Sequence, residues 1–129
     1  MSEVRYISTR GQAPILDFSD VLLAGLATDG GLYVPDQLPE IDISDLSGMS
    51  YVEVARKIIG AFLQQEFTAQ EIDGLIEDSY QSFTHPDIAP LVQLDNNLYV
   101  LEQFHGPTLA FKDFALQFLG RIFDAVLSR

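Results

Sequence analysis

The sequence predicts a mixed α/β fold, on three observations. Short apolar stretches of strand length alternate with longer segments in which apolar residues recur at helical spacing. Two of the helical segments begin with a capping box, the Ser/Thr-x-x-Glu pattern that closes a helix N-terminus. Hydrophobic residues make up 47% of the 129 residues, so the chain can bury a core.

The first part of the chain is predicted to form a short strand and a helix. Val4–Ser8 has the partial alternation of apolar and polar residues that is typical of a half-buried strand. Phe18–Ala27 carries apolar residues at helical spacing, and Asp17 or Ser19 could cap its first turn. We expect the segment Asp29–Gly31 to end this helix, because glycine adopts the left-handed conformation at little cost.

A second short strand and two longer helices come next. The apolar segment Leu32–Val34 is the predicted strand, and the proline after it ends the strand. Residues 50–64 and 68–83 are the predicted helices, each with an apolar face that we expect to pack in the core. Their capping boxes are Ser50-x-x-Glu53 and Thr68-x-x-Glu71.

The stretch His85–Pro90 is the predicted boundary between two domains. Pro86 and Pro90 lie within it, and two prolines so close together exclude a helix. We therefore expect residues 1–84 to form one small domain and residues 85–129 to form the beginning of a second.

The second part is predicted to contain a hairpin and a very apolar helix. Leu91–Leu94 and Leu98–Gln103 form the hairpin strands around a turn at Asp95–Asn97. A helix begins near Lys112, and its apolar face is so wide that we expect burial on several sides. The chain ends at Arg129, so we expect either a fragment of a longer protein or self-association through this helix.

Composition and charge argue against several classes of function. The net charge is −12 without any basic patch, so we expect neither nucleic acid nor a membrane surface as partner. No segment approaches the roughly 20 apolar residues that span a bilayer. The chain has no cysteine, which fits a cytoplasmic location. Its two histidines have no clustered ligands, so no metal site is expected.

Lys112 is the first candidate for chemistry. It lies between Phe111 and Asp113, after the loop Gly106–Thr108. One interpretation is a lysine at a helix start whose ammonium group reaches water. The other is a nucleophilic amine, which burial near the positive end of a helix would help to keep neutral. The residues alone leave both open, just as they leave His105 open between a site residue and a structural histidine.

Two regions resemble one enzyme family. The segment Phe104–Ala115 resembles the cofactor-lysine motif of the threonine synthase family, and it fits the broader lysine-attachment pattern of fold-type II pyridoxal-phosphate enzymes. Independently, Tyr6–Gly11, Phe18–Ala27 and Asp29–Pro35 resemble the small N-terminal domain of that family. The resemblance thus covers nearly the whole chain. It implies an α+β N-terminal domain followed by the truncated start of a fold-type II catalytic domain.

The resemblance implies a lyase reaction that uses pyridoxal 5'-phosphate as cofactor. Lys112 would bind the cofactor covalently and move protons during the reaction, and Phe111 would pack against the cofactor ring. Asp113 and Thr108 would position the lysine and its loop. The reaction of the family converts O-phospho-L-homoserine and water into L-threonine and phosphate, in threonine biosynthesis.

The chain departs from the family in the residues after Lys112. No segment there resembles the Gly/Ser/Thr-rich loop that holds the cofactor phosphate in family members. We therefore expect an N-terminal fragment that is inactive alone and binds the cofactor weakly if at all. The alternatives are another fold-type II lyase or dehydratase, and a non-catalytic interaction module that docks through the last helix. The block Asp29–Pro35 argues against a plain dehydratase, because dehydratases lack this N-terminal domain.

Overall fold

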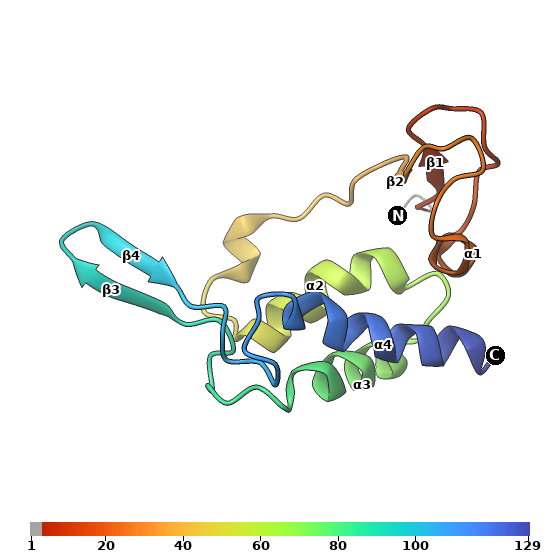
Figure 1. Cartoon of the computed structure of the whole chain (residues 1–129). Helices are drawn as coiled ribbons and strands as arrows, with labels where there is room; N and C mark the ends of the chain where they lie inside the picture. Colours follow the sequence, from red (N-terminus) through yellow and green to blue (C-terminus); the bar gives the residue numbers. More distant parts are fainter. Residues whose placement is uncertain (1–3) are drawn as a thin grey trace.

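The structure is a computed structural model and describes residues 4–129 (Figure 1). Its helices and small sheets confirm the predicted mixed α/β class. The short 3-10 helix η1 was not predicted. In chain order the elements are β1 (Tyr6–Ser8), α1 (Phe18–Ala24), β2 (Tyr33–Pro35), η1 (Ile43–Leu46), α2 (Tyr51–Leu63), α3 (Ala69–Tyr80), β3 (Leu91–Asp95), β4 (Leu98–Leu101) and α4 (Asp113–Leu127).

The N-terminal elements form a small unit in which β1 and β2 pair antiparallel and α1 lies between them in sequence. The Asp17 side chain caps α1 by accepting a hydrogen bond from the Asp20 N–H at 3.2 Å, as predicted. The prediction that this helix reaches Ala27 and ends at Gly30 and Gly31 is wrong. It ends at Ala24, because Gly25 takes a φ of 69° and its N–H closes the last turn on the Val21 carbonyl.

Both predicted capping boxes are confirmed. Ser50 accepts from the Glu53 N–H at 3.3 Å, and the Glu53 carboxylate accepts from the Ser50 N–H at 2.7 Å. Thr68 and Glu71 make the same reciprocal pair at the start of α3. Each box satisfies N–H groups that have no partner inside the helix, and so fixes where α2 and α3 begin.

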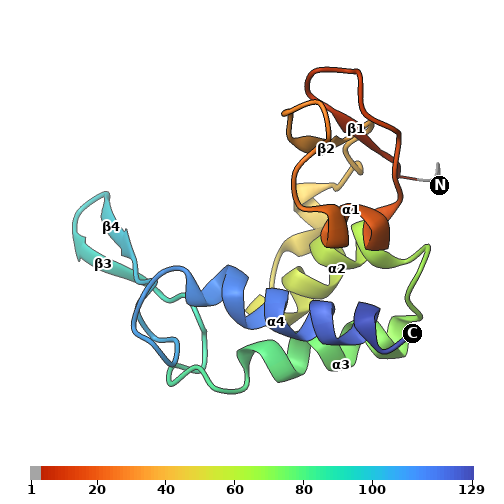
Figure 2. The same cartoon turned by 45° about the vertical axis from the view of Figure 1, so that its right-hand side comes forward.

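Helices α2, α3 and α4 enclose the main core. Figure 2 shows α4 lying beside α2 and α3, with α1 above its C-terminal end. Leu63, Ile76 and Ile122, one from each helix, are almost fully buried and belong to one apolar cluster. Burial of such side chains is the main stabilising term in folding, at roughly 1.5–3 kcal/mol for each. The helix that begins after Lys112 is therefore anchored by the core.

The predicted hairpin is confirmed and extends away from the helices (Figure 1). Strands β3 and β4 pair antiparallel, and Asn97 turns the chain with a φ of 60°. Large apolar side chains point outward from both strands: Leu91, Leu94, Leu98, Tyr99, Val100 and Leu101. Side chains that alternate across a strand face opposite sides of the sheet, so both sides of this hairpin are apolar and exposed.

The wide apolar face of the last helix is only partly covered within residues 4–129. Helix α4 buries Ile122 and Val126 against the core, whereas Leu116 is 54% exposed and Leu119 is 38% exposed. One apolar face of α4 thus remains open to solvent. Among the helices of residues 4–129, none combines the length and apolar character needed to cross a membrane.

Candidate functional site

Lys112 lies at the start of α4 and its backbone is fixed there. Its carbonyl accepts the N–H groups of Ala115 and Leu116 at 3.1 and 2.8 Å. Its side chain is exposed, and within residues 4–129 the ammonium group has no hydrogen-bond or ion-pair partner. The chain therefore presents a primary amine from a fixed point of the backbone.

Asp113, the next residue, is the anchor of the lysine loop. Its side chain is only 1% exposed, and Oδ2 accepts both the N–H and the hydroxyl of Thr108 at 2.9 Å. Gln117 donates to Oδ1 at 3.3 Å. Burial alone would raise the pKa of the Asp113 carboxyl, but these hydrogen bonds outweigh burial and lower the pKa. Asp113 is thus held as a carboxylate, and it ties the loop to α4.

Gly106 is required by this arrangement. A Cβ atom on Gly106 would lie 2.5 Å from Asp113 Oδ2 and 2.6 Å from Asp113 Cβ, which is closer than real Cβ contacts. The loop backbone therefore passes directly against the Asp113 side chain, and only a residue without a side chain fits there. The sequence motif predicted a specially shaped loop, and the contact with Asp113 is its physical reason.

The other end of the loop is held through His105. The Thr84 N–H donates to the His105 carbonyl at 2.9 Å, which joins the loop to the segment after α3. His105 Nε2 lies 2.7 Å from Glu102 Oε2. Of the two interpretations of His105, the structure supports the structural histidine, because its ring and its carbonyl both serve to anchor the loop.

Two large apolar side chains accompany the lysine on the surface. Phe111 is 64% exposed, and Leu109, also exposed, takes a positive φ of 65°. A branched residue rarely adopts this conformation, because its side chain crowds the backbone. The Leu109 N–H donates a hydrogen bond to the Gly106 carbonyl at 3.1 Å, which closes a turn in the loop. Phe111 is thus exposed next to Lys112 in the sequence, where its ring can pack against a flat ring bound to the lysine amine.

An aromatic cluster behind the lysine was not predicted from the sequence. The Phe114 ring contacts those of Phe83 and Tyr51, at centroid distances of 5.1 and 5.9 Å. The Tyr80 hydroxyl donates to the Phe114 carbonyl at 3.0 Å, and the Tyr51 and Tyr80 rings meet edge to face with centroids 4.9 Å apart. The first turn of α4 is therefore in contact with both α2 and α3.

The N-terminal motif serves a structural role far from Lys112. The Asp29 carboxylate accepts hydrogen bonds from Ser8 at 2.8 Å and from the N–H groups of Gln12, Ala13 and Gly31 at 2.9–3.0 Å. Although partial burial acts to raise the pKa of Asp29, these hydrogen bonds lower it overall. Arg10 donates to the Asp29 carbonyl. Figure 1 places β1 and β2 toward the C-terminal end of α4, whereas Lys112 is at its start.

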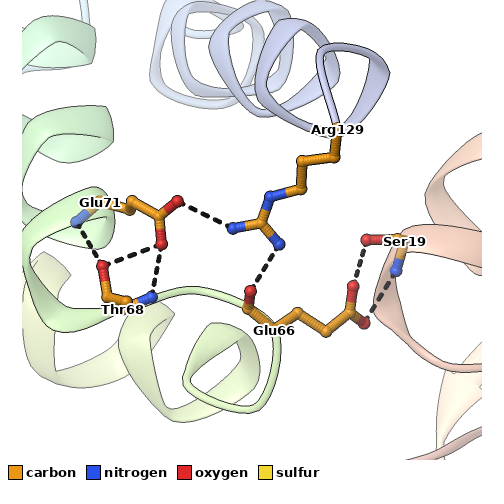
Figure 3. A network of polar contacts seen from close by, with 5 residues as sticks. All are labelled: Ser19, Glu66, Thr68, Glu71 and Arg129. Atoms are coloured by element: carbon orange, nitrogen blue, oxygen red, sulfur yellow. Dashed lines mark hydrogen bonds and ion pairs between the residues drawn. The ribbon is translucent and has the colours of Figure 1, made fainter.

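A second polar network joins the N-terminal unit to the core (Figure 3). The Glu66 carboxylate accepts from the N–H of Ser19 at 3.1 Å and from its hydroxyl, at the start of α1. Arg129 donates to the Glu66 carbonyl and to the Glu71 carboxylate, and its guanidinium lies 3.9 Å from the centre of the Phe67 ring. Residues from α1, the α2–α3 connection and the end of α4 thus meet at one point.

The surface between α2 and α3 is separate from the lysine loop. One surface cavity of about 530 Å³ lies between α2 and α3, but none of its lining residues belongs to the lysine loop. Within residues 4–129 no cluster of three side chains suits a metal ion. Lys112 and the loop Gly106–Phe111 therefore form the candidate site. A free amine beside an exposed aromatic ring fits covalent attachment of an aldehyde cofactor, and Lys112 would be the residue that holds it.

Comparison with known proteins connects this chain to one family. Residues 5–80 match the family described as threonine synthase N terminus. The chain is 52% identical to threonine synthase of Pseudomonas aeruginosa over 98% of its own length and 28% of the relative, and 43% identical to that of Schizosaccharomyces pombe over 99% and 26%. It therefore spans about a quarter of the length of these relatives.

Comparison with solved structures indicates the same family. The structure superposes with a TM-score of 0.94 on threonine synthase from Brucella melitensis bound to pyridoxal phosphate, at 50% identity over 98% of this chain and 28% of that one. The match includes both the N-terminal unit and the lysine loop, since nearly the whole chain is covered. The matched family, the sequence identity and the fold all agree. The chain therefore belongs to the threonine synthase family.

Proposed function

We propose that the chain forms the N-terminal part of a pyridoxal-phosphate-dependent threonine synthase, in which Lys112 binds the cofactor. The proposed reaction converts O-phospho-L-homoserine and water into L-threonine and phosphate. The observation that carries the proposal is the unpartnered Lys112 amine, displayed by the loop that Gly106 and Asp113 fix. The cysteine-free sequence supports a cytoplasmic location for this activity.

Four residues in and beside the loop have a proposed role. The cofactor, once bound, supplies an electron sink for bonds broken at the substrate. Lys112 Nζ holds the cofactor and then moves protons at the substrate Cα and Cβ. Phe111 covers one face of the cofactor ring. Asp113 and Thr108 keep the loop against α4, so that the amine stays where the reaction needs it.

We propose a division of the chain at Thr84. Residues 1–84 would correspond to the N-terminal domain, and residues 85–129 would begin the catalytic domain. Pro86 and Pro90 in the connection support the boundary. Helix α4 packs on α2 and α3, so the two parts share one core.

A chimaera tests the proposed activity. The matching 28% of the Pseudomonas aeruginosa enzyme would be replaced by this chain, which is 52% identical to it. The chimaera should release phosphate and threonine from O-phospho-L-homoserine. Lys112→Ala should abolish the reaction, whereas Lys57→Ala, which removes the other lysine, should leave it within about twofold. An active Lys112→Ala chimaera would refute the assigned role. The 129-residue chain alone should show no turnover.

A second function, binding through exposed apolar surface, is supported by a separate observation. Leu116 and Leu119 are exposed on one face of α4, and a large apolar patch on a soluble protein usually marks an interface. We propose that the free chain associates with a second copy through this face. Sedimentation should give a concentration-dependent mass that Leu116→Glu with Leu119→Glu reduces to the monomer. A wild-type chain that stays monomeric at high concentration would contradict it.

A further inference from the structure

The last residue of α3 contacts the backbone of the lysine helix. Tyr80 is buried, and its hydroxyl donates to the carbonyl of Phe114 at 3.0 Å. Phe114 is two residues beyond Lys112 and lies in the first turn of α4. Tyr80 is also the last residue of the segment that matches the family's N-terminal region. The N-terminal domain therefore reaches the candidate site through this hydrogen bond.

The contact is supported on its other side by a second tyrosine ring. Tyr51, at the start of α2, packs edge to face against Tyr80, with ring centroids 4.9 Å apart. The Phe114 ring packs in the same aromatic cluster against Tyr51 and Phe83. A buried phenol needs a hydrogen-bond partner, and here the partner is the helix turn that holds Lys112.

The first turn of α4 depends on contacts of this kind. The N-cap position is Lys112 itself, and no side chain caps the helix there. The N–H groups of Asp113 and Phe114 donate instead to the carbonyls of Ala110 and Phe111, at 3.1 and 3.3 Å, so the start of α4 depends on where the loop backbone lies. The turn is held from one side by the bond between Asp113 and Thr108 of the loop, and from the other by Tyr80 and the aromatic cluster.

We propose that Tyr80 is a positioning residue for Lys112. Its hydroxyl holds the first turn of α4 against α3, and this fixes the point from which the lysine amine is presented. Its importance for catalysis rests on the proposed function of Lys112. The positioning itself is a property of the chain and can be measured without the cofactor.

Two matched variants of the 129-residue chain test the proposal. Tyr80→Phe removes the hydroxyl bonded to the Phe114 carbonyl and keeps the ring. Tyr51→Phe removes the neighbouring hydroxyl and leaves that bond in place. Hydrogen exchange should be about fivefold faster at the Ala115 and Leu116 N–H groups in Tyr80→Phe, because a buried hydrogen bond contributes about 1 kcal/mol. Tyr51→Phe should remain within about twofold of wild type at both groups.

A second readout separates positioning from general stability. Pyridoxal phosphate would be trapped by borohydride, and the ratio of label on Lys112 to label on Lys57 would be measured in each chain. Tyr80→Phe should lower this ratio severalfold at a temperature where all chains are folded, and Tyr51→Phe should preserve it. Unchanged exchange in Tyr80→Phe would overturn the proposal, and so would a Tyr80→Phe chain that fails to fold. If the wild-type chain carried no more pyridoxal-phosphate label on Lys112 than on Lys57, the function proposed for Lys112 would be overturned. The hydrogen-exchange rates at Ala115 and Leu116 would still decide the role of Tyr80.

Discussion

Gly106 and Asp113 are in direct contact, so that a Cβ atom added to Gly106 would lie 2.5 Å from Asp113 Oδ2. Because the Asp113 Cβ is equally close, at 2.6 Å, the aspartate cannot swing aside without leaving its partners on Thr108. Gly106→Ala should therefore destabilise the chain by about 1–3 kcal/mol, as overpacking does, with the loss visible in urea unfolding.

Gly120 provides the control for this prediction. It lies within α4, and nothing is within 4 Å of a Cβ atom added there. Gly120→Ala should stabilise the chain by about 0.5–1 kcal/mol, because alanine favours a helix more than glycine does. Equal effects of the two substitutions would contradict the close approach of Gly106 to Asp113.

Asp113 should make stability depend on pH in acid. Its pKa is lowered in the folded chain, so its contribution is complete above the ordinary value of 3.8 and is lost as the pH falls through the lower, folded-state pKa. Asp113→Asn should be less stable than wild type at pH 7, and the difference should shrink as the pH falls below 3.8. Thermal unfolding between pH 7 and pH 2.5 measures this.

The matched control is Asp124→Asn, an exposed position on the same helix. Its melting temperature should follow that of wild type across the range. Asp29, whose pKa is also lowered, should behave as Asp113 does. A difference between Asp113→Asn and wild type that does not change with pH would contradict the assignment of a buried carboxylate.

Glu66 should couple α1 to the helical core. Its carboxylate accepts two hydrogen bonds from Ser19, at the start of α1 (Figure 3). Glu66→Ala leaves those donors without their partner, so hydrogen exchange in α1 should become severalfold faster while α2 and α3 stay protected. Gln65→Ala, at the exposed neighbouring position, should leave the exchange rates of α1 and of the α2–α3 core unchanged. Faster exchange throughout the chain would indicate a global effect and contradict a local link.

Arg129 should contribute more to stability than the other arginine of this region. It lies over the Phe67 ring and bonds to Glu66 and Glu71, whereas Arg121 bonds to Gln117 within its own helix. Arg129→Ala should lower the free energy of unfolding by about 1 kcal/mol, and Arg121→Ala should lower it by less than half of that. Equal losses in urea unfolding would show that the contacts of Arg129 add nothing.

Local sequence signals predicted most of the helices and strands. The capping boxes at Ser50 and Thr68 fixed the start of two helices, because a cap depends only on residues three apart. The end of α1 was misplaced, since both Gly25 and the later glycines could have ended it. The exposed face of α4 could not be predicted from periodicity, because periodicity identifies an apolar face without saying what covers it.

The candidate site was predicted less completely than the fold. The resemblance identified Lys112 and its neighbours, and Asp113 does contact Thr108 in the structure. The burial of Asp113 and the bond from Tyr80 to Phe114 were not foreseen. The latter joins residues 34 apart in sequence, and no local pattern reports a contact over that distance.

Trapping of the cofactor on the chain tests the role of Lys112 most directly. The chain has two lysines, and Lys57 is paired with Asp45 at 2.8 Å, whereas the Lys112 amine has no partner among residues 4–129. The chain would be mixed with pyridoxal phosphate, reduced with borohydride, digested and analysed by mass spectrometry. We predict label concentrated on Lys112, even if binding is weak, because reduction makes it permanent. Label shared equally between Lys112, Lys57 and the N-terminal amine would contradict this role of Lys112.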